Sequence, residues 1–146
     1  MATTINVYLN FPGNCEEAFN FYKSVFGGEF PYVGRFGEMP PDAGPQIPEE
    51  AKNKIMHISL PVSAETILMG SDTGGEWAKD YKAGNNFSIS VNADTVEEAT
   101  RLYNALSAGG TQTMPLAKTF WSDAFGMLVD KFGIAWMVSL NTPPQQ

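Results

Sequence analysis

The stretch EEAFNFYKSVFGG, residues 16–28, recurs later in the chain as EEATRLYNALSAGG, residues 97–110. The Glu-Glu-Ala opening and the following tyrosine repeat at an offset of 81 residues (16 to 97), and both stretches end in a pair of glycines. In both, the apolar residues follow the three-and-four spacing of a helix with one buried face. A repeat of this length indicates two copies of one supersecondary unit, which the flanking sequence should then complete.

The composition restricts the class of protein. A chain of 146 residues suits one domain whose core needs no disulfide. Its 9 basic and 16 acidic side chains give a net charge of −7, and the basic residues form no cluster, which argues against a nucleic-acid partner. The single cysteine, Cys15, falls on the apolar side of the first helix, so we expect a buried thiol rather than a reactive one. With no leader-like start and no apolar run of about 20 residues, we expect a cytoplasmic protein with no membrane partner.

The first half of the chain predicts a strand, a helix and three more strands. Residues 4–10 alternate apolar and polar side chains, as a half-buried strand does. Asn14 and Glu17 form a capping-box-like start, so we expect a helix from there to about Phe26, ended by the glycine pair. The other strands of this unit are expected at residues 29–36, 54–61 and 65–71, with Met56, Ile58 and Leu60 opposite Ile55, His57 and Ser59.

Two stretches are expected to lack regular structure. Residues 37–53 contain four prolines and predict a long exposed loop, which is either a plain insertion or a lid over a pocket. Residues 72–85 are rich in glycine and read as a linker, held down by Trp77 and Tyr81.

The second half repeats the same order of elements. Residues 86–92 alternate as a strand, and Thr95 with Glu98 forms a second capping box. The helix that follows should bury Val96, Ala99, Tyr103 and Leu106. Three more strands are expected at residues 111–118, where Pro115 marks an edge or a bulge, and at 125–130 and 134–140, which form a hairpin around Gly133.

These elements predict an α+β fold of two βαβββ repeats in a single domain, residues 1–146. The repeats span about residues 4–71 and 86–140, with the linker at 72–85 between them. Each sheet can bury its apolar face under its own helix, which leaves the polar faces of the two first strands turned elsewhere. We therefore expect the two sheets to enclose a polar-lined ligand cup, with these first-strand residues in it: Asn6, Tyr8, Asn10, Asn86, Ser88 and Ser90.

The repeat resembles the vicinal oxygen chelate superfamily, which includes the glyoxalase, bleomycin-resistance and extradiol dioxygenase proteins. Three stretches resemble its PhnB-type branch: YLNFPGNCEEAFNFYKSVFGGEF, IMHISL with ILMGSD, and FWSDAFGMLVDKFGIAWMVS. The resemblance covers almost the whole chain and is most specific in the last stretch. It implies a glyoxalase-like fold with a ligand cup and, commonly, a homodimer. Some sequences of this branch also carry the name of a demethylubiquinone methyltransferase.

The resemblance also implies positions for a divalent metal, on the first and last strands of both units. In this chain those positions fall on Asn6, on Leu68 or Met69, on Asn86 and on Met137. None of these is a good ligand, because hard divalent cations prefer carboxylate and imidazole donors. We therefore predict no cofactor and no metal-binding residues, with a divalent metal as the alternative.

His57, the only histidine, is the best catalytic candidate, because imidazole is the side chain suited to general acid or base chemistry near neutral pH. A structural or pocket-lining role competes with that reading. Trp121 and Phe125 could stack on a planar substrate, whereas Trp136 is expected to pack under a helix. The ligand-binding candidates are Asn6, Tyr8, Asn10, His57, Ser59, Asn86, Ser88, Trp121, Phe125 and Met137.

Four functions remain open at this point. The first is a small-molecule-binding protein without a classical metal site, and the second is a metal-dependent lyase, isomerase or dioxygenase of the same superfamily. A methyltransferase is the third; it would need a glycine-rich loop after the first strand, and FPGN, residues 11–14, is a poor substitute. The fourth is a purely structural dimer with a filled cup. The sequence does not decide whether any catalysis occurs.

Overall fold

The computed structural model describes residues 3–40, 48–73 and 79–140. Within the described residues, the chain forms two compact units, Met1–Lys82 and Ala83–Gln146, each built from one sheet and one long helix. Residues 41–47 of the predicted loop and Trp77 of the predicted linker lie outside the described residues.

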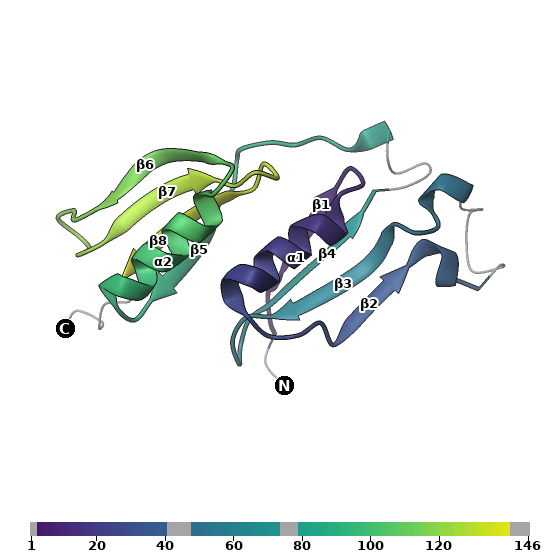
Figure 1. The fold of residues 1–146 in the computed structure, drawn as a ribbon, viewed down its shortest axis with the longest axis horizontal. Helices are drawn as coiled ribbons and strands as arrows, with labels where there is room; N and C mark the ends of the chain where they lie inside the picture. The colour runs from purple at the N-terminus through teal and green to yellow at the C-terminus, as the bar shows by residue number, and fades with distance from the viewer. Residues whose placement is uncertain (1–2, 41–47, 74–78, 141–146) are drawn as a thin grey trace. The chain divides into compact units, whose positions relative to one another are not determined.

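The first unit runs strand, helix, strand, strand, strand (Figure 1). Its sheet has the order β1-β4-β3-β2, in which β1 pairs in parallel with β4 and the other neighbours are antiparallel. Two short 3-10 turns follow the second strand: η1 (Phe36–Glu38), which begins one residue before the predicted loop, and η2 (Glu49–Ala51), which lies within it. The main elements are β1 (Val7–Phe11), α1 (Cys15–Phe26), β2 (Tyr32–Arg35), β3 (Ile55–Pro61) and β4 (Ile67–Asp72).

The second unit has the same element order and topology. Its sheet has the order β5-β8-β7-β6, again with the first and last strands parallel. The elements are β5 (Ile89–Ala93), α2 (Val96–Ser107), β6 (Thr111–Ala117), β7 (Phe125–Val129) and β8 (Ala135–Leu140). The predicted α+β class with two βαβββ units is confirmed, whereas a cup between the two sheets stays a prediction.

Each helix packs on one face of its own sheet (Figure 1). The ring of Phe19 in α1 lies against Gly70 of β4, where an added Cβ would stand 2.6 Å from it, and Tyr103 of α2 lies against Gly126 of β7 in the same way, at 2.8 Å. Burial of each large apolar side chain contributes about 1.5–3 kcal/mol, so packing rather than intrinsic propensity stabilises these helices. The predicted buried side of α1 is confirmed over most of its length, and only Phe26, at the end of the stripe, is partly exposed. The buried residues are Cys15, Ala18, Phe19, Tyr22 and Val25.

Several predicted details are wrong at the ends of elements. The first strand begins at Val7, and Ile5 is 95% exposed. Likewise β5 begins at Ile89, after Phe87, which is 53% exposed. On α2 the sequence placed Val96 in the buried stripe, but Val96 is the first helical residue and lies 48% exposed, while Leu102 is buried instead.

A register shift explains one error inside the first sheet. The predicted alternation put Ile55 on the same face as His57 and Ser59. In the structure, Arg35 pairs with Ile55 while the preceding Gly34 pairs with His57, so β3 carries an extra residue. Such a bulge reverses the alternation beyond it, and Ile55 is fully buried.

The predicted edge and hairpin of the second sheet are confirmed. Strand β6 lies at the sheet edge, and its pairing with β7 shifts on both sides of Met114. Between β7 and β8, Gly133 has a φ of 89°, which favours glycine. The buried carboxylate of Asp130 accepts hydrogen bonds from the backbone N–H groups of Phe132 and Ile134 and from Trp136 Nε1, at 2.8–3.0 Å. Asp130 therefore stabilises the turn between β7 and β8.

No helix in the described parts of the chain has both the length and the apolar character needed to cross a membrane.

Candidate functional site

The first sheet has a face that α1 does not cover, which we call the first open face. Alternation along the strands puts the core residues Leu9, Ile58 and Gly70 on the helix side. The residues between them must then project from the other side. In the sheet register, one cross-strand row is Tyr8, Met69, Ser59 and Tyr32, and the next row contains Asn10, Ser71, His57 and Gly34.

Three rings gather on the first open face. Tyr8 Oη and His57 Nδ1 lie 3.2 Å apart, and which of them donates depends on the histidine tautomer. The ring centroids of Tyr8 and Tyr32 lie 5.5 and 5.6 Å from that of His57. The Tyr32 ring lies across Gly34, where an added Cβ would stand 2.7 Å from Tyr32 Oη. His57 therefore lies between two half-exposed tyrosines and is within hydrogen-bond distance of one of them.

The second sheet has a corresponding second open face, on the side away from α2. Trp136, Val138 and Leu128 are buried on the helix side. Their neighbours in sequence form two cross-strand rows on the opposite side. One row is Ser90, Met137, Met127 and Met114, and the other is Asn92, Ser139, Phe125 and Ala117.

Some of the predicted site residues lie on the open faces of the sheets, and others lie outside the strands. Tyr8, Asn10, His57 and Ser59 share the first open face, and Met137 and Phe125 share the second. Asn6 precedes β1, and Asn86 and Ser88 precede β5, so none of these three lies in a strand. Trp121 is 52% exposed in the β6–β7 loop, with its ring centroid 5.4 Å from that of Phe125.

Sequence reasoning missed several open-face residues, among them Tyr32, Asn92, Met114 and Met127. Tyr32 lies at the start of a four-residue strand, which is too short to give a clear alternation. Met127 lies directly opposite Met137 in the β7–β8 hairpin. Its period-two spacing from Phe125 was the signal that could have identified it.

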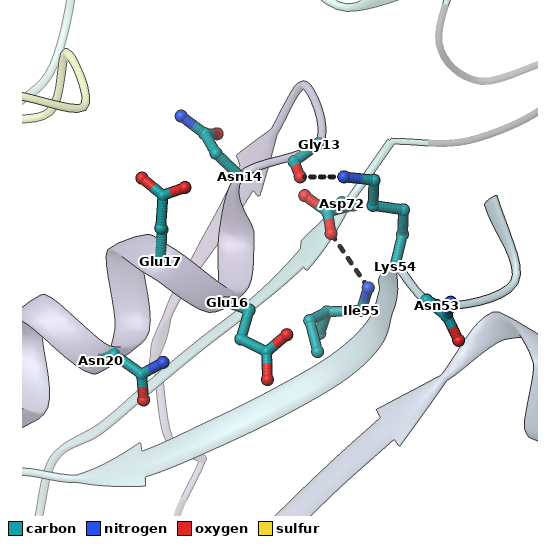
Figure 2. Close-up of a pocket in the computed structure, with 9 residues that line it drawn as sticks. All are labelled: Gly13, Asn14, Glu16, Glu17, Asn20, Asn53, Lys54, Ile55 and Asp72. Atoms are coloured by element: carbon teal, nitrogen blue, oxygen red, sulfur yellow. Dashed lines mark hydrogen bonds between the residues drawn. The ribbon is translucent and has the colours of Figure 1, made fainter. Parts of the chain in front are cut away.

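A pocket of about 410 Å³ lies elsewhere in the first unit, beside the N-terminus of α1 (Figure 2). Three carboxylates, three amide side chains and Lys54 surround it, so its walls are polar and mostly acidic. The residues that line it are Gly13, Asn14, Glu16, Glu17, Asn20, Asn53, Lys54, Ile55 and Asp72.

Most polar groups of this pocket already bind other parts of the protein. Asp72 is 3% exposed and accepts hydrogen bonds from the backbone N–H groups of Cys15, at 2.8 Å, and of Ile55, at 2.9 Å. Lys54 Nζ donates to the carbonyl oxygen of Gly13 at 2.9 Å, as Figure 2 shows. The predicted cap by Asn14 is wrong: its side chain makes no capping bond, and Asp72 caps the helix instead. We read this pocket as a junction between α1, β3 and β4.

The charged groups around the junction affect one another. Both carboxylate oxygens of Glu16 bind the Arg35 guanidinium, at 2.7 and 3.0 Å. This hydrogen bonding lowers the pKa of Glu16. Burial, with the negative charges of Asp72 and Glu16, raises the pKa of the Cys15 thiol well above its usual range. Cys15 is therefore held as a neutral thiol, and the prediction of a buried, unreactive cysteine agrees with its complete burial.

The open faces do not fit a hard divalent metal. The positions implied for metal ligands hold Asn6, Met69, Asn86 and Met137, or the buried Leu68. Among the described residues, no three or more His, Cys, Asp and Glu side chains come close enough together to hold an ion. Amide and thioether donors bind Mg²⁺, Mn²⁺ or Zn²⁺ poorly, so these side chains do not suit such an ion.

Comparison with known proteins gives a family and a fold. The model of the family described as 3-demethylubiquinone-9 3-methyltransferase matches residues 3–139. The structure of protein PA1353 from Pseudomonas aeruginosa is 41% identical with a TM-score of 0.81, over 97% of this chain and 100% of that one. A PhnB protein from Bacillus cereus that carries the same methyltransferase name is 27% identical with a TM-score of 0.69, over 95% and 100% of the two chains. A glyoxalase-related enzyme from Fulvimarina pelagi shares the fold, at 15% identity and a TM-score of 0.60, over 95% and 89%.

Proposed function

This chain belongs to the family described as 3-demethylubiquinone-9 3-methyltransferase, in the PhnB-type branch of the glyoxalase-like superfamily, and we propose that it is a small-molecule-binding protein rather than a methyltransferase. We further propose that ligand binds on the open face of a sheet, and that on the first open face Tyr8, His57 and Tyr32 are its polar contacts. The observation that carries this proposal is the ring cluster on the first open face.

Methyl transfer from a nucleotide-like donor is a poor match to this architecture. Such donors are usually held at the carboxyl ends of a parallel sheet, by a glycine-rich turn between a strand and a helix. In each described sheet only one pair of neighbouring strands is parallel, β1 with β4 and β5 with β8. The turn between β1 and α1 is Pro12-Gly13-Asn14. The family name therefore describes the sequence relationship rather than this chain's chemistry.

The first open face offers a ligand specific hydrogen-bonding groups. The hydroxyls of Tyr8 and Tyr32 and the second ring nitrogen of His57 can bind a ligand's carbonyl, amide or hydroxyl group. The ring faces contribute apolar contact around them. Small-molecule sites generally combine apolar walls with a few such positioned polar groups.

A thermal-shift screen against metabolites and antibiotics tests the proposal. We expect at least one compound class to raise the melting temperature of the wild-type protein, because a ligand that binds only the folded state stabilises it. His57→Gln should remove that rise while leaving the melting temperature of the free protein nearly unchanged. A screen with no stabilising compound, or full stabilisation of the His57→Gln variant, would contradict the proposal.

Gly34→Ala tests the contribution of Tyr32 to ligand binding on the same face. The added methyl would meet Tyr32 Oη and Cε1 at 2.7–2.8 Å, so the tyrosine ring has to leave its position beside His57. We expect weaker ligand binding with little change in stability, because Tyr32 is half exposed. Affinity and melting temperature together check this, and unchanged affinity would remove Tyr32 from the site.

Metal loading tests the alternative function. The purified protein would be incubated with Zn, Ni, Mn and Fe salts and dialysed, and its metal content measured. We expect no stoichiometric retention, because the open faces hold one imidazole and no carboxylate. One retained ion per chain would favour a metal-dependent lyase, isomerase or dioxygenase.

We also propose that the protein is a cytoplasmic homodimer. The fully buried Cys15 thiol is compatible with a reducing compartment, and the dimer is an expectation from the family resemblance. Sedimentation equilibrium would measure the assembly, and a monomer over the whole concentration range would contradict this part.

A further inference from the structure

The second open face has a chemistry that selects a class of ligand. Its centre is a row of thioethers, formed by Met114, Met127 and Met137 on three neighbouring strands. All three side chains are partly exposed. Thioether side chains are polarisable and flexible, and they make favourable contacts with aromatic rings at about 5 Å.

An aromatic series lies at one end of this row. Phe125 lies two residues before Met127 on β7 and contacts Trp121. Trp121 in turn contacts Phe120, with ring centroids 4.7 Å apart. Trp121 is 52% exposed and Phe120 is 97% exposed, which is an unusual position for two adjacent large rings. The two rings meet edge to face, at 85°, so they do not cover each other.

Hydrogen bonds fix the loop that carries these rings. Thr119 Oγ1 accepts from the backbone N–H groups of Trp121 and Ser122, at 3.3 and 3.1 Å, and the Thr119 N–H donates to the Ser122 carbonyl at 2.9 Å. Ser122 Oγ in turn donates to the carbonyl of Ala124 at 2.7 Å. A loop held in place before binding loses little entropy when a ligand stacks on a ring that it carries.

The strands of the second sheet carry no charged side chain, although the chain has 25 Asp, Glu, Lys and Arg residues (9 basic and 16 acidic). None of the four strands of the second sheet, ISVNA, TQTMPLA, FGMLV and AWMVSL, contains one. Lys118 and Asp123 flank the aromatic loop and are exposed. The strands themselves therefore offer no charged partner to an ionised group, whose desolvation over the thioether row would then oppose binding.

We propose that the second open face binds the planar aromatic ring of an uncharged small molecule. The thioether row and Trp121 contact the ring. Asn92 supplies a polar contact beside them, because Ser139 Oγ donates to its Oδ1 at 2.6 Å and leaves its amide N–H₂ for a ligand acceptor. This inference rests on the proposed small-molecule function and adds the class of ligand.

Three probes with one ring and different charges test the inference. They are 4-hydroxybenzamide, which is neutral, 4-hydroxybenzoate, which is an anion, and 4-hydroxybenzylamine, which is a cation. The protein would carry ¹³C-labelled methionine methyl groups, whose NMR signals report on each thioether. We expect the neutral probe at millimolar concentration to shift the signals of Met114, Met127 and Met137 and to leave Met39 unchanged. The charged probes should bind at least about tenfold more weakly.

Variants separate the ring contact from the fold. Trp121→Ala should weaken the neutral probe several-fold without lowering the melting temperature, because Trp121 is half exposed. Phe132→Ala, on the β7–β8 turn, serves as the control for loss of an aromatic ring away from this face.

Three results would each overturn the inference. They are equal or tighter binding of a charged probe, the absence of methionine shifts with all three probes, and shifts that depend on protein concentration alone. The last result would identify a second copy of the chain as the occupant. Failure of the function itself is seen separately, as the absence of any stabilising compound in the thermal-shift screen.

Discussion

The two units share one topology but secure their helices differently. At the N-terminus of α2, Thr95 caps its own helix, since its Oγ1 accepts the Glu98 N–H at 3.1 Å. At the N-terminus of α1 the neighbouring Asn14 makes no such bond, and Asp72 of β4, 57 residues away, accepts the Cys15 N–H. A local cap stabilises one helix end. The distant carboxylate also binds Ile55 and so ties the helix to two strands.

The open faces differ more than the scaffolds do. The first face presents a cluster of three rings, two tyrosines and one imidazole, whereas the second presents thioethers next to a tryptophan. The helix sides of both sheets are conventional apolar cores. The packing side is therefore alike in the two units, whereas the side that packing does not use carries different chemistry in each.

The largest expected effect comes from removing the distant cap. Asp72→Asn leaves one oxygen acceptor and places an N–H₂ group against a backbone N–H, in a site that is 3% exposed. A buried unsatisfied donor and the loss of a charge-assisted bond together predict a loss of about 2–4 kcal/mol of unfolding free energy. Urea unfolding measures this, and Asp123→Asn, at an exposed position, is the matched control. A loss below about 1 kcal/mol would show that the local backbone holds α1 without Asp72.

Removal of the local cap should cost less. Thr95→Ala leaves the Glu98 N–H to water at an exposed helix end, which predicts a loss of about 1 kcal/mol. The same urea titrations give the comparison with Asp72→Asn. If both variants lose equal stability, the proposed difference between a local and a distant cap is wrong.

The smallest effect concerns the glutamates of the first helical turns. Glu16 pairs with Arg35 of β2, whereas Glu98 pairs with Arg101 of its own helix. The Glu16 side chain is 51% exposed, so Glu16→Gln should lose less than about 1 kcal/mol. Because the pKa of Glu16 is lowered in the folded protein, its contribution is present above the ordinary value of 4.5 and is lost as the pH falls below it.

Unfolding curves at several acidic pH values check the sign of this effect. The wild type should lose stability faster than Glu16→Gln as the pH falls below 4.5. A difference between the two proteins that stays constant over that range would show that the ion pair adds no stability.

The sequence predicted the repeat and both helices because their signals are strong and local. The stripe of α1 and the cap by Thr95 are short-range patterns, and both agree with the structure, although the Glu98 side chain binds Arg101 rather than completing the capping box. The cap by Asp72 was not predictable in this way, since it depends on β4 pairing beside β1. The bulge in β3 that buries Ile55 likewise arises from its pairing with β2.

The candidate site could be predicted in part for the same reason. Tyr8, His57 and Ser59 follow from alternation along single strands. The contacts between Tyr8, His57 and Tyr32 depend on cross-strand register, as does the thioether row. The side chains on one face of a single strand can therefore be predicted from the sequence. The clusters that they form across strands can be predicted only when the register of the sheet is known.

The central claim is that ligand binds the open faces rather than the acidic pocket beside α1. The most direct measurement is an NMR titration of backbone amides with the compound that raises the melting temperature most. The account predicts shifts at Tyr8 and His57, with Glu17 and Asn20 of the pocket unchanged. Shifts confined to Glu17, Asn20 and their neighbours would contradict it.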